Sequence, residues 1–194
     1  MVAIIQYNAG NVQSVQYALH RLGVDAIITN DASIITSADK VIFPGVGHAA
    51  AAMECLQQLQ LINLLSNLKQ PVLGICLGMQ LLCTYSNEGN TNCLGIFNQS
   101  VKLFNTNTLK VPHVGWNSIT NFQSILFNNI PNNAFVYSVH SYYASIGIHT
   151  VATTNYVNTF SAALQKNNFY GVQFHPEKSG DIGEKILKNF ISLA

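Results

Sequence analysis

Charged residues are scarce in this sequence. Only 9% of its 194 residues are Asp, Glu, Lys or Arg, whereas a soluble domain usually has about a quarter. Polar surface must therefore come largely from Asn, Gln, Ser and Thr, and we expect a partner protein to cover part of the surface. The formal net charge of +1 gives no reason to expect binding to nucleic acid or another polyanion.

Long apolar runs and paired cysteines are also missing. No stretch approaches the roughly 20 apolar residues that a membrane-spanning helix needs, and residues 1–5 lack the basic start and the length of a secretory signal. No C-x-x-C pair occurs among Cys55, Cys76, Cys83 and Cys93, so neither a zinc site nor a redox motif is predicted. We therefore expect a cytoplasmic protein without a metal or other cofactor.

Strands alternate with helices in the first half of the chain. Apolar strands are predicted at residues 2–6, 24–29 and 40–44, and an amphipathic helix with Asn11 as its N-cap follows the first of them. This alternation is typical of a doubly wound α/β sheet, in which ligands bind at the carboxyl ends of the strands. All residues, 1–194, are expected to form one domain.

The second half has the pattern of antiparallel hairpins, because Asn, Gly and Pro turns divide short strands. A short helix is predicted within residues 121–129. The last segment has one apolar helical face, with Asp181 and Glu184 as a possible capping box. The predicted strands are residues 96–104, 111–119, 134–145, 150–155, 160–165 and 170–174.

Cys76 lies in a Gly-x-Cys-x-Gly turn, between an apolar strand and a helix expected to continue through Tyr85. Such a turn is sharp enough to require Gly two residues either side of the nucleophile, here Gly74 and Gly78. The helix N-terminus would favour the thiolate form of the cysteine. A buried structural cysteine is the simpler interpretation, but the two flanking glycines favour a nucleophile.

A base and an acid follow the last predicted strand. His175 would lie at the same sheet edge as Cys76, Pro176 would fix the turn, and Glu177 would point back to the imidazole. Such a relay activates a nucleophile and orients its base. An isolated histidine there would more often be a surface residue, as we interpret His20 and His149.

The segment Pro44-Gly45-Val46-Gly47 follows the third strand. Its glycines would let a backbone N–H point into the crevice, as an oxyanion hole requires. An ordinary turn explains this segment equally well.

Three motifs together resemble the class I (triad) glutamine amidotransferases: Pro-Gly-Val-Gly, Gly-Ile-Cys-Leu-Gly-Met-Gln and Gln-Phe-His-Pro-Glu-Lys-Ser. The resemblance spans the whole chain. Met79 before Gln80, and the block at residues 113–117, are similar to the glutaminase subunits of imidazole glycerol phosphate synthases. This resemblance implies a flavodoxin-like mixed sheet with helices on both faces and additional antiparallel strands in the C-terminal half.

The resemblance also implies a role for each matching residue. Cys76 would be the nucleophile, His175 the acid and base, and Glu177 its orienter. The implied oxyanion donors are the backbone N–H groups of Val46, Gly47 and Leu77. The implied glutamine-binding residues are Gly47, Gln80, Glu88, Ser141 and Tyr142, and the implied partner-facing residues are Trp116, Tyr137 and Lys178.

A (β/α)8-barrel cyclase of histidine biosynthesis is the partner that the resemblance implies. It would receive the ammonia, since this sequence has no Gly-rich phosphate loop and no Arg/Lys cluster. The first loop departs from the pattern, because relatives mostly have Asp-Tyr-Gly where this chain has Gln6-Tyr7-Asn8. The departure concerns the partner side of the site and not the triad.

Three alternatives remain at this point. A paralogue could supply ammonia to a different cyclase-like partner, for instance one that aminates a sugar. A non-enzymatic subunit would lack a triad member, whereas all three are present. A stand-alone Cys hydrolase would not need the glutamine-binding Gln80 and Glu88.

Overall fold

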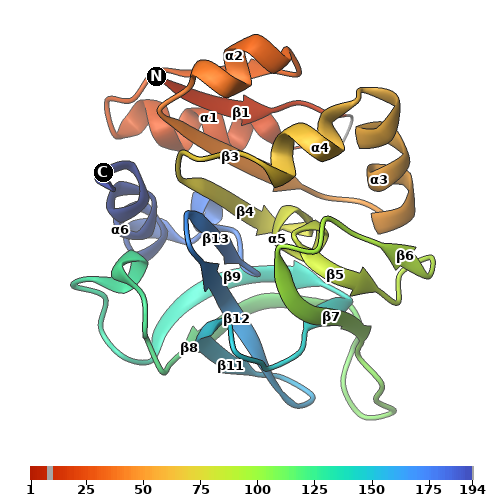
Figure 1. The fold of residues 1–194 in the computed structure, drawn as a ribbon. Coiled ribbons are helices and arrows are strands. Elements are labelled where there is room, and N and C mark those ends of the chain that lie inside the picture. The colour runs from red at the N-terminus through yellow and green to blue at the C-terminus, as the bar shows by residue number, and fades with distance from the viewer. Residues whose placement is uncertain (8–10, 194) are drawn as a thin grey trace.

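The computed structural model describes residues 1–7 and 11–193, and its central feature is a mixed sheet with strand order β11-β12-β13-β4-β3-β1-β2 (Figure 1). The strands from β13 to β2 run parallel, while β11 and β12 pair antiparallel. The predicted α/β class is confirmed. The strands are β1 Val2–Ile5, β2 Ala26–Thr29, β3 Lys40–Gly45, β4 Val72–Cys76, β11 Thr150–Asn155, β12 Thr159–Lys166 and β13 Phe169–Val172.

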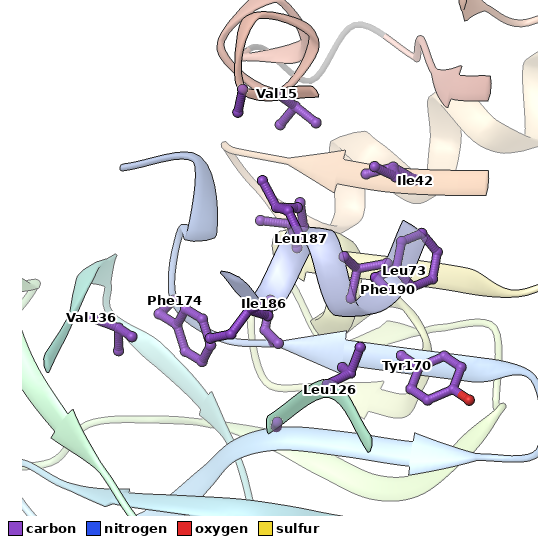
Figure 2. Close-up of a cluster of buried hydrophobic side chains, with 14 of the residues drawn as sticks. Val15, Ile42, Leu73, Leu126, Val136, Tyr170, Phe174, Ile186, Leu187 and Phe190 are labelled. Atoms are coloured by element: carbon purple, nitrogen blue, oxygen red, sulfur yellow. The ribbon is translucent and has the colours of Figure 1, made fainter. Parts of the chain in front are cut away.

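Helices cover both faces of this sheet, because alternate residues of its inner strands enter two separate apolar clusters. Val2 and Ile4 of β1 pack with residues of α1 and α6, and Figure 2 shows this cluster around Leu187 and Phe190. Ala3, the residue between them, packs on the other face with α2, α3 and α4. The helices are α1 Val12–Arg21, α2 Ala32–Ser37, α3 Ala49–Gln58, α4 Leu61–Ser66, α5 Leu77–Leu81 and α6 Gly180–Ile191.

Two smaller sheets lie below the parallel strands in the view of Figure 1. One has the order β10-β7-β5-β6, and the other is the antiparallel hairpin β8-β9. The first lies near the carboxyl end of β4 because β5 follows α5 directly in the chain, and the hairpin does so because the carbonyl of Val139 in β9 lies 3.9 Å from Cys76 Sγ. These strands are β5 Cys83–Ser86, β6 Thr91–Asn92, β7 Phe97–Leu103, β8 His113–Ile119, β9 Ala134–His140 and β10 Tyr142–Ala144.

Two predicted elements end earlier than expected. The helix after Cys76 stops at Leu81, and the residues up to Ser86 form β5, which pairs with β7. These residues are apolar enough to fit either element, so pairing with a distant strand decides between them. The single strand predicted at residues 134–145 is divided at Ser141, and its two parts join different sheets.

Of the two predicted helix caps, Asn11 has the predicted position but not the capping hydrogen bond, and the predicted capping box is wrong. Asn11 occupies the N-cap position of α1, but its backbone is left-handed (φ 76°) and its side chain makes no cap hydrogen bond. The helix α6 begins at Gly180 after Ser179, without the predicted box of Asp181 and Glu184. In both cases a tertiary hydrogen bond engages the side chain at the N-cap position, since Asn11 donates to Glu177 and Ser179 accepts from the N–H of Tyr137.

The predicted short helix within residues 121–129 is a 3₁₀ turn, η1 Ile125–Phe127. Asn8, one of the residues at which the first loop differs from the Asp-Tyr-Gly of relatives, lies outside the described residues. No helix in the described part of the chain is both long and apolar enough to span a membrane.

Candidate active site

Cys76 occupies a tight turn between β4 and α5. Its backbone has φ 54° and ψ −112°, a conformation that costs energy for any residue with a Cβ. A Cβ on Gly78 would overlap the carbonyl of Phe43, and one on Gly74 would collide with the backbone of Met79. The prediction that only glycine fits at these two positions is therefore confirmed.

His175 and Glu177 reach the same sheet edge from the neighbouring strand. In the parallel pair β13-β4, Val172 is opposite Ile75, so the two strands end at the same edge of the sheet, beside Cys76. Pro176 opens a 3₁₀ turn, η2 Pro176–Lys178. The turn brings the carboxylate back, and His175 Nδ1 lies 2.8 Å from Glu177 Oε1, with both side chains almost completely buried.

The surroundings of His175 favour its protonated form. Burial by itself lowers the pKa of this imidazole, but the neighbouring Cys76 and the hydrogen-bonded carboxylate of Glu177 raise the pKa to about 10. An imidazolium at neutral pH suits a proton donor that faces a thiolate. The arrangement therefore places a protonated imidazole, oriented by a carboxylate, beside the nucleophile.

Asn11 contributes a fourth side chain that the sequence did not reveal. Its Nδ2 donates to Glu177 Oε1 at 2.7 Å, across 166 residues of sequence. Glu177 Oε1 thus accepts hydrogen bonds from Asn11 and His175 together. The only sequence signal was the tolerance of asparagine for the left-handed conformation that a turn requires.

A pocket of about 300 Å³ opens beside Cys76. Every residue predicted to bind glutamine or hold the oxyanion lines it, whereas Pro112, Val139 and His140 were not predicted. Its walls come from the end of β3, from α5 and from the β9-β10 junction. The lining residues are Val46, Gly47, Cys76, Leu77, Gln80, Glu88, Pro112, Val139, His140, Ser141 and Tyr142.

Two of the predicted glutamine-binding side chains are fixed by hydrogen bonds to backbone groups. Glu88 Oε2 accepts from the N–H of Ala49 at 2.7 Å, in the first turn of α3. Gln80 Nε2 donates to the carbonyl of Tyr142 at 2.9 Å. Both side chains are therefore oriented without a ligand.

The segment carrying the predicted oxyanion donors is anchored by Tyr7. The hydroxyl of this buried residue donates to the carbonyl of Pro44 at 2.8 Å. A Cβ on Gly45 would collide with the same hydroxyl. Gly47 has φ 115°, a conformation that glycine adopts readily because it has no Cβ. The chain therefore turns sharply at the pocket wall.

The predicted partner-facing residues lie outside the pocket but next to the triad. Trp116 and Tyr137 are cross-strand neighbours in β8-β9, with ring centroids 6.0 Å apart, and Trp116 is 55% exposed. Lys178 is exposed on η2. The carbonyl of Tyr137 accepts from the N–H of His175 at 2.9 Å, so this hairpin contacts the base directly.

Two further histidines were interpreted as ordinary residues, and neither His20 nor His149 lines the pocket. His140 does line it. Its Nδ1 must donate to the carbonyl of Tyr142 at 2.8 Å, because a carbonyl only accepts. Burial lowers the pKa of His140 to about 3, so this imidazole is neutral and cannot replace His175 as a proton donor.

Comparison with known proteins agrees with this geometry. Residues 3–193 match the family described as glutamine amidotransferase class-I. The chain is 55% identical to "Imidazole glycerol phosphate synthase subunit HisH" of Bacteroides fragilis and 47% identical to the protein of that name from Yersinia pseudotuberculosis, with 99% of each chain covered.

Solved structures share the fold at low sequence identity. One described as a glutamine amidotransferase has a TM-score of 0.76 at 13% identity, covering 98% of this chain and 97% of its own. PurLQS from Thermotoga maritima has a TM-score of 0.71 at 16% identity, covering 98% and 96%. The family match and the full-length relatives together show that this chain belongs to the class I glutamine amidotransferases.

Proposed function

We propose that this chain is the glutaminase subunit of an imidazole glycerol phosphate synthase, which hydrolyses glutamine and passes the ammonia to a (β/α)8-barrel cyclase in histidine biosynthesis. The observation that carries this proposal is the relay of Cys76, His175 and Glu177 beside a pocket lined by all the predicted glutamine-binding residues. Full-length relatives named as that subunit support the choice of pathway.

In the first half of the reaction, the Cys76 thiolate attacks the carbonyl carbon of the glutamine side-chain amide. The oxygen takes up the electron pair as an oxyanion, for which the N–H groups of Leu77 and of Val46 or Gly47 are the proposed donors. An amide nitrogen leaves poorly unless it is protonated. His175 supplies that proton, ammonia departs, and a thioester on Cys76 remains.

In the second half, neutral His175 takes a proton from a water molecule, and the resulting hydroxide attacks the thioester carbon. The carbon–sulfur bond breaks, glutamate leaves and the thiolate returns. Glu177 keeps the ring oriented through both halves, because its carboxylate stays on Nδ1 while Nε2 exchanges protons.

The pocket also suits the amino-acid end of glutamine. Both amide hydrogens of Gln80 are engaged, by Tyr142 and by Gln173, so the side chain offers only its oxygen to a ligand. Glu88 has one carboxylate oxygen left after Ala49. Two acceptors in one pocket suit an α-ammonium group, and we propose that they bind that of glutamine.

Ammonia released into water would be protonated and lost as a nucleophile, so the acceptor site must be close by. The hairpin β8-β9 presents Val114, Trp116 and Phe135, each more than half exposed, beside the base. Exposed apolar residues of this size are typical of a protein interface. We propose that the cyclase docks on this hairpin and on Lys178.

The test uses the chain co-expressed with the barrel cyclase encoded in the same genome. We expect Cys76→Ser to abolish glutamine-dependent synthesis of imidazole glycerol phosphate and to preserve synthesis from ammonium. Cys76 forms ammonia but does not touch the acceptor, which is the physical reason. Equal loss of both activities in an assembled complex would contradict the proposal, and so would a wild-type complex that releases no glutamate.

A further inference from the structure

Gln173 lies between the triad and the glutamine pocket, and no role above depends on its contact with the nucleophile. It follows β13 directly, and its N–H donates to the carbonyl of Ala162 at 2.9 Å. In the parallel pair with β4, Val172 is opposite Ile75, so the next residues, Gln173 and Cys76, are neighbours on the same face. The side chain is 1% exposed. A buried amide of this kind needs hydrogen-bond partners.

The orientation of the Gln173 amide follows from its neighbours. The carbonyl of Tyr142 can only accept, so the Gln80 atom at 2.9 Å from it must be Nε2. The second hydrogen of that Nε2 points to Gln173 at 3.0 Å, where the partner must be the acceptor Oε1. The amino group of Gln173 therefore faces the other way, toward Cys76.

On that side, Gln173 Nε2 lies 3.8 Å from Cys76 Sγ, within hydrogen-bond range for sulfur. The sulfur has a second neighbour, the carbonyl of Val139 at 3.9 Å. Of these two neighbours, Val139 can accept a hydrogen bond from the thiol, whereas only Gln173 can donate one to the thiolate. Hydrogen bonds to the charged form favour that form. The two contacts therefore favour different protonation states of the same sulfur.

We propose that Gln173 is a positioning residue with two functions: its amino group stabilises the thiolate of Cys76, and its carbonyl holds Gln80 in the orientation that accepts the glutamine ammonium. The first function stands on the geometry around the sulfur. The second rests on the proposed glutaminase function. One neutral side chain thus connects the reacting atom with substrate recognition, and it adds no charge beside the thiolate–imidazolium pair.

The first test measures alkylation of Cys76 by iodoacetamide in the isolated chain as a function of pH, with the modified peptide quantified by mass spectrometry. Gln173→Met keeps the length of the side chain but removes its donor. A hydrogen bond to a charged group corresponds to a shift of about one to two pH units. We expect the midpoint of the alkylation profile to rise by about that amount, with roughly tenfold slower labelling below it.

The second test separates the two functions by steady-state kinetics of glutamate release in the complex with the cyclase. Gln173→Glu retains an oxygen that accepts from Gln80, so its KM for glutamine should stay within about twofold of wild type while kcat falls. Gln173→Met loses the acceptor as well, and its KM should rise about tenfold. An equal KM for the two variants would overturn the role toward Gln80.

Gln165→Met is the matched control, since Gln165 lies on the adjacent strand β12, opposite Tyr170, and outside the pocket. Its alkylation profile should equal that of wild type.

A lower melting temperature of Gln173→Met with an unchanged alkylation profile would show a merely structural role and overturn the inference. If Gln173→Met does not fold, the midpoint is read from the isosteric Gln173→Glu, which loses the donor and adds a carboxylate that repels the thiolate, so an unchanged profile there also overturns the inference. Absence of glutamate release by the wild-type complex would instead refute the proposed function and leave the alkylation test standing.

Discussion

The nucleophile and the base of this site are held in place by different kinds of interaction. Cys76 is fixed by its own strand–helix turn and by the strand beside it, because Gly74 lies against the backbone of Met79 and Gly78 against the carbonyl of Phe43 in β3. His175 and Glu177 are fixed by segments distant in sequence, through the carbonyl of Tyr137 and the side chain of Asn11. The nucleophile thus depends on one turn and the strand beside it, while the base depends on segments from both halves of the chain.

This difference indicates where the site is sensitive. A change beside Cys76 acts on the backbone, so it should disturb folding and catalysis together. A change at a distant partner of His175 or Glu177 removes one hydrogen bond and leaves the fold intact. The base also adjoins the hairpin β8-β9, where we propose that the cyclase docks. We therefore expect the cyclase to contact the side of the site formed by His175 and Glu177 before it affects Cys76.

The largest effect should come from Gly78→Ala. The added methyl group would overlap the carbonyl of Phe43 in β3, so we expect a loss of at least about 3 kcal/mol in the free energy of unfolding and no measurable glutaminase activity. Urea denaturation and glutamate release measure the two effects. Gly23→Ala is the control, because its φ is +74° but no atom of the described residues lies within 4 Å of the new Cβ. It should cost only about 1–2 kcal/mol, and equal losses in both variants would contradict the role of the close contact between Gly78 and Phe43.

Glu177→Gln should reduce turnover by about 10²–10⁴-fold. The amide can still contact His175 Nδ1, but it does not stabilise the imidazolium that protonates the leaving nitrogen. The thermal stability should change far less than in Gly78→Ala. Turnover within threefold of wild type would contradict the proposed role of this carboxylate.

Substitution of Asn11 should reduce turnover less than Glu177→Gln does and should leave the stability of the fold unchanged. Asn11→Gly keeps the left-handed backbone (φ 76°) and removes only the donor to Glu177, so turnover should fall about tenfold. Asn11→Asp should fall further, because its carboxylate repels that of Glu177. The control is Asn167→Gly, another asparagine with positive φ, in the exposed turn between β12 and β13. If this control loses as much activity as Asn11→Gly, the effect is not specific to Glu177.

The smallest predicted effect is a pH dependence of stability. The pKa of His175 is raised to about 10, above the ordinary value of about 6.5, so its protonation stabilises the folded state. This contribution is complete below about pH 6.5 and is lost as the pH rises through about 10. We expect the unfolding free energy of wild type, relative to His175→Asn, to fall by at least about 1 kcal/mol over this range. A constant difference would contradict the raised pKa.

Sequence patterns predicted most of the elements that carry the site, because glycine spacing and apolar periodicity are local signals. They failed where a segment had two possible partners. Residues 83–86 became a strand only because β7 is available to pair with them. The division of residues 134–145 at Ser141 arises because its two parts pair with different strands, β8 and β7. This division places Ser141 and Tyr142 in the pocket wall.

The sequence by itself determined the elbow at Cys76 and the order of nucleophile, base and acid, since each depends on neighbouring residues and on chemistry that only certain side chains provide. Only the tertiary structure decided that Asn11 supports Glu177 and that Gln173 faces the sulfur. Those contacts join residues 166 and 97 positions apart. No local pattern encodes such a distance, because it depends on how every intervening strand and helix packs.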